Sequence, residues 1–249
     1  TAGTPTIYGG TSYVNQYFKG SISIRSAIGD TGGSGLNASS CQVSINSGGW
    51  TATGVTQDAS YCYYNTYSPA ANFTIAFRVM DGTGVYGTSG TQSYIYDITA
   101  PTGTITYSTQ YITSVATDPV MTIGSVTEAG SGENVATRIL QRATATLSND
   151  ACVSYGGFAT TTQGGTYPNV TDTGTIIDAT CYKYQWQTTD NMGNTGTFTT
   201  ATEYKVDTTA PATTVSGVTE SSADIYYASG PKTVFYKTPA SSQNFTVNA

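Results

Sequence analysis

The sequence predicts an all-β protein built from tandem β-sandwich domains. Its residue types favour strands and tight turns, because Thr, Val and Ile are frequent, Tyr occurs 20 times and Gly 28 times. Apolar residues alternate along the chain, and no stretch keeps the 3.6-residue apolar period of a helix. A long segment also occurs twice, which indicates repeated domains of one kind.

Two motifs mark this repeat. Residues 93–101 read SYIYDITAP, and residues 203–211 read EYKVDTTAP about 110 positions later. Shortly upstream of each, residues 81–88 and 190–197 both read D-x-x-G-x-x-G-T. Because both motifs recur in the same order and at nearly the same spacing, we expect the two segments to share one fold.

The segments before these motifs match as well. Residues 73–79 and 182–188 both alternate, and their apolar positions align one for one. Further upstream, each segment has an acidic Gly-Ser-Gly loop, at residues 30–35 and 128–132. Seven or so short strands within about 100 residues, joined by turn signals, are typical of an immunoglobulin-like sandwich. A closed barrel also suits short strands, but repeats joined end to end favour sandwiches.

We therefore predict immunoglobulin-like repeats at residues 1–97 and 98–207, and the opening strands of a third, incomplete repeat at 208–249. The strands of the third repeat are expected at residues 212–218, 225–227, 232–237 and 244–247. Pro101 and Pro211 fix φ and hold the preceding residue extended, so each junction should be short and stiff. Part of a sandwich cannot bury a core, so either the parent protein continues or this tail pairs with another chain.

The D-[TI]-T-A-P junctions, the D-N-x-G-N turn at residues 190–194 and the G-S-G loop resemble those of tandem immunoglobulin-like repeats in bacterial surface proteins. The resemblance covers essentially the whole chain as a pattern. It implies a large secreted or cell-surface protein, such as an adhesin, a stalk or a filament component, usually without enzymatic activity. Residues 81–85 read D-G-T-G-V, so the first repeat departs from the Asn positions of the turn.

Charge and residue content argue against several functions. The net charge is −6, and the nine Lys and Arg residues are spread singly, so no basic stripe faces a nucleic acid. No run of about 20 apolar residues indicates membrane insertion. Without His, Ser-His-Asp and Cys-His catalysis is excluded, and paired carboxylates for glycoside cleavage are the remaining alternative to a non-enzymatic protein. The chain opens at Thr1 without Met or a signal peptide, so we expect a mature or internal fragment.

Four cysteines fall into two pairs, Cys41 with Cys62 and Cys152 with Cys181. Neither pair has the C-x-x-C spacing of a zinc or redox site. An even count in a chain of low charge favours disulfides and secretion, one disulfide inside each repeat, over free buried thiols.

Three acidic residues are candidates for a Ca²⁺ site. One end of a sandwich gathers the incoming chain and two loops, which in the second repeat carry Asp97, Glu128 and Asp190. Three converging carboxylates can hold Ca²⁺, which takes six to eight oxygen ligands. The alternative is that each residue only caps its turn by accepting backbone N–H bonds.

Further residues extend this hypothesis. Asn191 and Asn194 can add amide oxygens, and Asp207 would serve the third repeat. In the first repeat, the corresponding candidate ligands are Asp30 and Asp81 only.

Aromatic residues gather in two places. Those on residues 182–188 are expected to be core: Tyr182, Tyr184 and Trp186. Four more are harder to bury together and form a candidate binding patch, because Tyr offers a large contact area at low entropy cost: Tyr61, Tyr63, Tyr64 and Tyr67.

The sequence thus predicts a non-enzymatic, extracellular structural or adhesive module of a long repeat protein at a cell surface or in a filament. Its expected partners are neighbouring copies of itself, adjacent repeats, and glycans or a host or matrix surface. No cofactor other than Ca²⁺ is expected. The alternative is a carbohydrate-binding accessory module of a secreted enzyme, which predicts a row of two or three exposed aromatic residues on one sheet face.

Overall fold

The computed structural model describes residues 1–249 apart from 108–110, 211–216, 221–224, 229–232, 237–244 and 249. Every regular element in the described part is a β-strand, which confirms the all-β prediction. The chain divides into two compact units, Thr1–Asp207 and Thr208–Ala249. No helix in the part that the structure describes has the length and apolar character needed to cross a bilayer.

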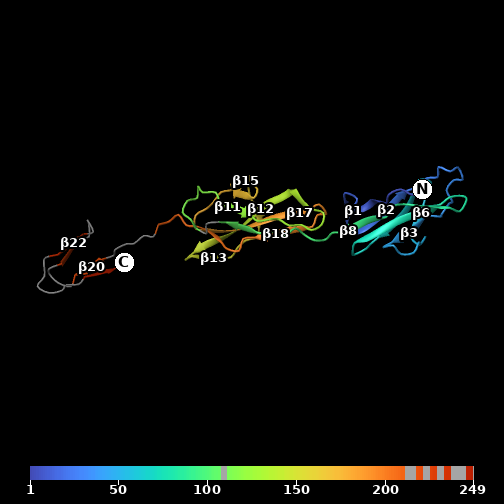
Figure 1. The fold of residues 1–249 in the computed structure, drawn as a ribbon. Coiled ribbons are helices and arrows are strands. Elements are labelled where there is room, and N and C mark those ends of the chain that lie inside the picture. Colours follow the sequence, from blue (N-terminus) through green and yellow to red (C-terminus); the bar gives the residue numbers. More distant parts are fainter. Residues whose placement is uncertain (108–110, 211–216, 221–224, 229–232, 237–244, 249) are drawn as a thin grey trace. The chain divides into compact units, whose positions relative to one another are not determined.

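The larger unit begins with a first sandwich. Its strands are β1 (Thr6–Tyr13), β2 (Tyr17–Ala27), β3 (Gln42–Ile45), β4 (Val55–Gln57), β5 (Tyr61–Tyr67), β6 (Phe73–Met80), β7 (Tyr86–Thr88) and β8 (Gln92–Tyr96). One layer joins β1, β2, β5 and β4, and the other joins β3, β7 and β8 to β6 (Figure 1). The end of β8 also pairs in parallel with the start of β2, so its hydrogen bonds connect the two layers.

The core of the first sandwich lies between these layers. Alternate residues of a strand point to one face, and six inward-facing apolar residues of β2 and β6 are at most 1% exposed: Phe18, Ile22, Ile24, Ile75, Phe77 and Val79. They form one apolar cluster with Tyr94 of β8. Burial of this cluster is the main favourable contribution to folding of this part of the chain.

A second sandwich follows. Its strands are β9 (Ile105–Tyr107), β10 (Tyr111–Ile112), β11 (Val120–Ile123), β12 (Glu133–Ser148), β13 (Ala151–Val153), β14 (Ala159–Thr160), β15 (Gln163–Thr166), β16 (Asn169–Asp172), β17 (Thr180–Asp190), β18 (Thr195–Thr199) and β19 (Tyr204–Val206). One sheet has the order β15-β16-β11-β9. The other has the order β10-β19-β17-β12-β13, with β14 and β18 paired to β12 and β17.

The second core is built on β17, as the alternation of residues 182–188 predicts. Tyr182, Tyr184 and Trp186 are at most 1% exposed and pack in one cluster with Met121 of β11 and Leu140 of β12. The larger unit therefore consists of two immunoglobulin-like β-sandwiches, each with its own core.

The D-x-x-G-x-x-G-T motif builds the same turn in both sandwiches. Its first glycine has a positive φ, 91° at Gly84 and 79° at Gly193, a conformation that glycine adopts at low cost. Its second glycine makes room for the incoming chain. A Cβ added at Gly196 would collide with the carbonyl O of Pro101, and one added at Gly87 would lie 2.9 Å from the N of Thr1. The junction therefore packs directly on this turn.

Both expected disulfides are present, but they occupy different places in the two sandwiches. Cys41–Cys62 joins the segment before β3 to β5, and so connects the two layers. Cys152–Cys181 joins β13 to β17 within a single sheet, across β12. The two disulfides therefore do not occupy equivalent positions, although each lies inside one repeat.

Within the described residues, the smaller unit contains four short strands, β20 (Gly217–Glu220), β21 (Ile225–Ala228), β22 (Thr233–Tyr236) and β23 (Phe245–Asn248). β20 pairs antiparallel with β23, and β21 with β22. The other residues of the strands expected at 212–218, 232–237 and 244–247 lie outside the described part of the chain.

Candidate functional site

One residue, Asp97, connects the linker to both sandwiches. Its backbone N donates to the carbonyl O of Phe18 in β2 at 3.0 Å. Its side chain instead belongs to the second sandwich, because Oδ2 accepts from the N of Ser131 at 2.8 Å. Oδ1 accepts from the N of Thr99 at 3.2 Å, and Asp97 is only 2% exposed. The linker is thus tied to both sides at a single position.

The loop at residues 128–132 supplies the second carboxylate, that of Glu128. Its Oε1 accepts from the N of Gly130 at 2.6 Å, and its Oε2 accepts from the N of Gly132. Position 130 requires glycine, because an added Cβ would lie 2.6 Å from Oδ1 of Asp97. The Gly-Ser-Gly sequence therefore lets the loop wrap closely around the carboxylate of the linker.

The turn after β17 supplies the third carboxylate, that of Asp190, which is 1% exposed. Its Oδ1 accepts from the backbone N of Met192 at 2.8 Å and of Asn194 at 2.7 Å. Such bonds are typical of an Asp that caps a turn. All three carboxylates thus accept backbone N–H bonds, as the turn-capping interpretation expects.

These three residues, the carboxylate cluster, also converge. Asp97, Glu128 and Asp190 each place a carboxylate oxygen within 4.8 Å of the other two. None of the three forms an ion pair in the described part of the chain. Like charges at this separation repel by about 3–4 kcal/mol per pair at an effective dielectric constant near 20. A divalent cation would replace this repulsion by attraction, and carboxylate oxygens are the ligands that Ca²⁺ prefers.

Ser131 adds an independent observation. It is 6% exposed, and its backbone N bonds the carboxylate of Asp97. Its Oγ is buried without a hydrogen-bond partner, and leaving a buried hydroxyl unpaired is unfavourable. The sequence marks Ser131 only as the middle residue of a Gly-Ser-Gly loop, so the unpaired oxygen could not be foreseen.

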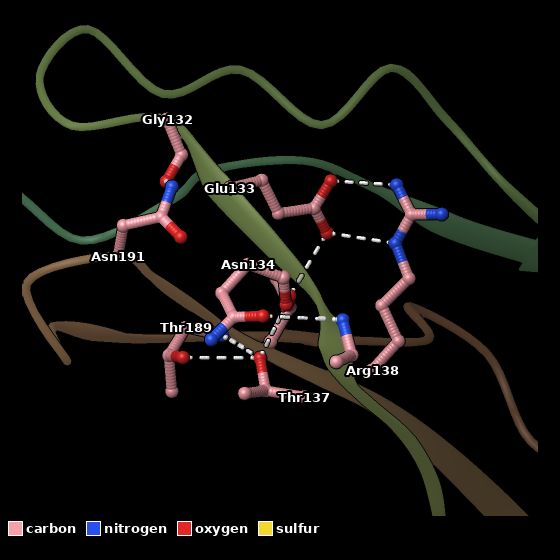
Figure 2. Close-up of polar contacts among 9 residues, drawn as sticks. Gly132, Glu133, Asn134, Thr137, Arg138, Thr189 and Asn191 are labelled. Carbon is pink, nitrogen blue, oxygen red and sulfur yellow. Dashed lines mark hydrogen bonds and ion pairs between the residues drawn. The ribbon is translucent and has the colours of Figure 1, made fainter.

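The two asparagines of the D-N-x-G-N turn hold the cluster in place. Nδ2 of Asn191 donates to the carbonyl O of Ser131 at 2.8 Å and of Gly132 at 2.9 Å, and Figure 2 shows Asn191 beside Gly132. Nδ2 of Asn194 donates to Oδ2 of Asp190 at 2.6 Å, and its Oδ1 accepts from Nζ of Lys19 at 2.6 Å. Both amides therefore position the loop and the turn in this structure.

A bulge in β12 secures the end of the same loop. The pairing of β12 with β17 shifts register between Asn134 and Ile139. Arg138 in this bulge forms a bidentate pair with Glu133, with N–O distances of 2.9 and 2.6 Å (Figure 2). The hydrogen bond from Arg138 lowers the pKa of Glu133. Because Glu133 follows Gly132 directly, this pair anchors the strand that continues from the loop.

The corresponding residues of the first sandwich, Asp30 and Asp81, are not part of the cluster. Oδ1 of Asp30 accepts from the N of Gly32 at 2.8 Å, and Oδ1 of Asp81 accepts from the N of Thr83 at 2.8 Å. Hydrogen bonds from Gly32 and from the Thr83 hydroxyl lower the pKa values of Asp30 and Asp81, respectively. Asp207 lies after β19, and its backbone N bonds the carbonyl O of Ile112.

The four tyrosines of the candidate patch divide between two faces of β5. Tyr64 and Tyr67 pack against the core of the first sandwich. Tyr61 and Tyr63 flank the fully buried Cys62 and lie on the opposite, outer face. Alternation places Tyr64 on the same inward face as Cys62. A register shift then brings Tyr67 to that face as well, since the pairing moves from Ile24↔Tyr64 to Ile22↔Tyr67 and leaves two residues of β5 opposite one of β2. The patch therefore does not present its four rings together.

No protein-family model matches this chain, and no curated protein matches it either. Solved structures with a similar arrangement include fibronectin(III)-like modules of Clostridium thermocellum CbhA, with 8% identity, a TM-score of 0.37 and coverage of 85% of this chain and 99% of that one. Murine CEACAM1b has 10% identity, a TM-score of 0.31 and coverage of 82% and 99%. At such low TM-scores, these likenesses carry no argument about what the chain binds.

Proposed function

We propose that this chain is a non-enzymatic structural and adhesive module of an extracellular protein. Repeats of this kind would follow one another in a long cell-surface or filament-forming chain of the bacterial tandem-repeat type. The observation that carries the proposal is the double anchoring of Asp97, which bonds Phe18 of one sandwich and Ser131 of the next. Two disulfides within the repeats support an oxidising, extracellular environment.

The proposal includes a Ca²⁺ ion bound by Asp97, Glu128 and Asp190. The support is their convergence within 4.8 Å together with the unpaired, buried Oγ of Ser131. A hollow of about 180 Å³ lies beside Glu128 and is lined by residues of the linker and the loop, including Thr99. Because Asp97 also bonds the first sandwich, an ion at this cluster would stiffen the junction between repeats.

Stiffness can be measured by ¹⁵N relaxation on the full chain in calcium. Both sandwiches of the wild type should report the same rotational correlation time. Asp97→Ala removes the side-chain anchor and should give the two sandwiches different, shorter correlation times. Asp207→Ala is the matched control, since it changes a junction Asp outside this linker. Independent tumbling of the two sandwiches in the wild type would refute the structural proposal.

Calcium can be tested separately by thermal melts with Ca²⁺ and with chelator. Calcium at 100 times its Kd stabilises the folded state by about 2.7 kcal/mol, which raises the Tm of a domain of this size by roughly 10–20 °C. Glu128→Gln should abolish this rise, whereas Asp30→Asn should preserve it. An equal Tm in calcium and in chelator would rule out the ion and leave the relaxation result to decide the structural role.

A second function, a carbohydrate-binding module, is favoured by one specific observation. Tyr8 joins Tyr61 and Tyr63 on the outer sheet face, with ring centroids of Tyr8 and Tyr63 5.5 Å apart and those of Tyr61 and Tyr63 5.8 Å apart. A row of aromatic rings on one sheet face is what this alternative predicts. Carbohydrate binding is compatible with an adhesive module. The two proposals differ in one respect: a carbohydrate-binding accessory module would accompany a secreted enzyme.

A further inference from the structure

The outer face of β1, β2 and β5 carries a compact group of three tyrosines around one arginine. The guanidinium carbon of Arg25 lies 4.4 Å from the ring centroid of Tyr61 and 5.4 Å from that of Tyr8. Tyr63 contacts both other rings. We call these four residues, Tyr8, Arg25, Tyr61 and Tyr63, the tyrosine face.

Strand pairing explains why these residues meet. Arg25 of β2 lies directly opposite Tyr63 of β5 and opposite Thr6 of β1, and Ala27 pairs with Tyr61. Side chains of opposite and diagonal residues on one face of a sheet are within reach of one another. The face therefore rests on three hydrogen-bonded strands rather than on a loop, which keeps its geometry fixed.

Polar neighbours orient the hydroxyl groups of this face. The Tyr63 hydroxyl donates to Oδ2 of Asp58 at 2.7 Å, and the Tyr8 hydroxyl bonds Oδ1 of Asn65. The hydrogen bond from Tyr63 lowers the pKa of Asp58, so this carboxylate is charged at neutral pH. The face thus combines aromatic rings with fixed hydrogen-bond acceptors at its border.

Arg25 retains unused donor capacity. Its guanidinium forms no ion pair with any residue that the structure describes, so the terminal nitrogens are the donors that a ligand can use, whereas Nε is buried and unpaired. The first sandwich contains a contrasting case in Arg78, which lies over Trp50 and Tyr86. Nε of Arg78 donates to Oε1 of Gln42 at 2.7 Å. Arg78 therefore has a hydrogen-bond partner within the protein, whereas Nε of Arg25 has none.

A hollow adjoins the tyrosine face. It has a volume of about 420 Å³, within the range of small-ligand sites, and its lining consists of Leu36, Ala38, Ser39, Gln57, Asp58 and Ala59. Asp58 connects the two surfaces, because it lines the hollow and accepts the bond from Tyr63 of the tyrosine face. A ligand longer than one ring can therefore contact the face and the hollow together.

We propose that the tyrosine face and its adjoining hollow bind a neutral saccharide chain. Tyrosine rings can pack against the apolar C–H face of a pyranose, as aromatic residues do in ligand sites. Asp58 can accept from sugar hydroxyls, and Arg25 can donate to them. Charges of opposite sign side by side favour an uncharged ligand that both donates and accepts, whereas an acidic glycan or an acidic peptide would meet Asp58. The inference rests on the adhesive part of the proposed function.

Affinity electrophoresis on the full chain tests this directly. Native gels would contain one soluble polymer each: mixed-linkage β-glucan, galactomannan or xyloglucan as neutral saccharides, polygalacturonate as an acidic one, and polyglutamate as an acidic peptide. We expect at least one neutral polymer to retard the wild type. Tyr61→Ala and Tyr8→Ala should each raise the Kd about tenfold, while Tyr86→Ala, which removes the ring over Arg78, should change it less than about twofold.

Thermal melts of each variant confirm that the chain is folded, and Tyr8 is suited to this purpose because it is 42% exposed. The proposal is overturned if no neutral polymer retards the wild type, or if only polygalacturonate or polyglutamate does. It is also overturned if Tyr86→Ala weakens retardation as much as Tyr61→Ala. These outcomes leave the relaxation and calcium experiments unaffected, so failure of the saccharide site is distinguishable from failure of the structural role.

Discussion

Replacing Gly196 by alanine is the sharpest test of how the junction packs. Gly196 is buried in β18 and pairs with Thr188 of β17. An added Cβ would collide with the carbonyl O of Pro101 and would lie 3.0 Å from its carbonyl C. Ordinary contacts begin near 3.4 Å, so either the linker or β18 must move.

The size of the effect follows from what surrounds this contact. β18 is held by its ladder to β17, and the linker is held by the mutual backbone bonds of Thr102 and Thr127 at 2.9 and 2.8 Å. Neither side can yield without losing hydrogen bonds, so the cost should lie in the upper part of the 1–3 kcal/mol that is typical of overpacking. About 2–3 kcal/mol corresponds to a fall in Tm of roughly 10–20 °C for a domain of about 100 residues.

The matched control is Gly87→Ala, at the same motif position in the first sandwich. Its Cβ would lie 2.9 Å from the N and Cα of Thr1, a milder overlap than the one at Gly196, so the loss should lie at the lower end of overpacking, about 1 kcal/mol. Urea unfolding followed by circular dichroism measures both variants. Equal losses at the two positions, or no loss at Gly196, would refute the argument that the junction packs on this turn.

Three further changes have expected outcomes. Asn191→Ala removes two bonds to the loop carbonyls and should weaken calcium binding about 10–100-fold in a calcium titration; unchanged affinity would contradict a positioning role. Cys152→Ser combined with Cys181→Ser opens a separation of 29 residues and should cost about 3–4 kcal/mol, measured by urea unfolding and contradicted by a loss below about 1 kcal/mol. Burial raises the pKa of Tyr204 to about 12 and the pKa of Tyr184 still further. Unfolded tyrosines ionise first, so stability should be constant below pH 10 and fall as pH rises from 10 through 12; urea midpoints that hold steady over that range would contradict this.

Local patterns in the sequence were sufficient to locate the central strands β6 and β17 and to identify their inward faces. The alternation of residues 73–79 and 182–188 corresponds to β6 and β17, and Trp186 is in the core as that pattern predicts. A period of two follows from the geometry of a single strand, so it can be read without knowing any partner. The acidic positions at the end of the second sandwich could also be named, because the order of strands in a sandwich places those loops together.

Only the tertiary structure decided which side chains meet. Tyr67 turns into the core because a register shift against β2 reverses the alternation of β5 after Tyr64, and no local pattern marks that shift. Arg25 joins Tyr8 and Tyr61 through pairing between strands far apart in the sequence. The unpaired Oγ of Ser131 depends on how the loop folds around Asp97. The spacing of residues along one strand is a local property, whereas register, bulges and buried hydrogen-bond partners depend on two or more segments and exist only once the chain has folded.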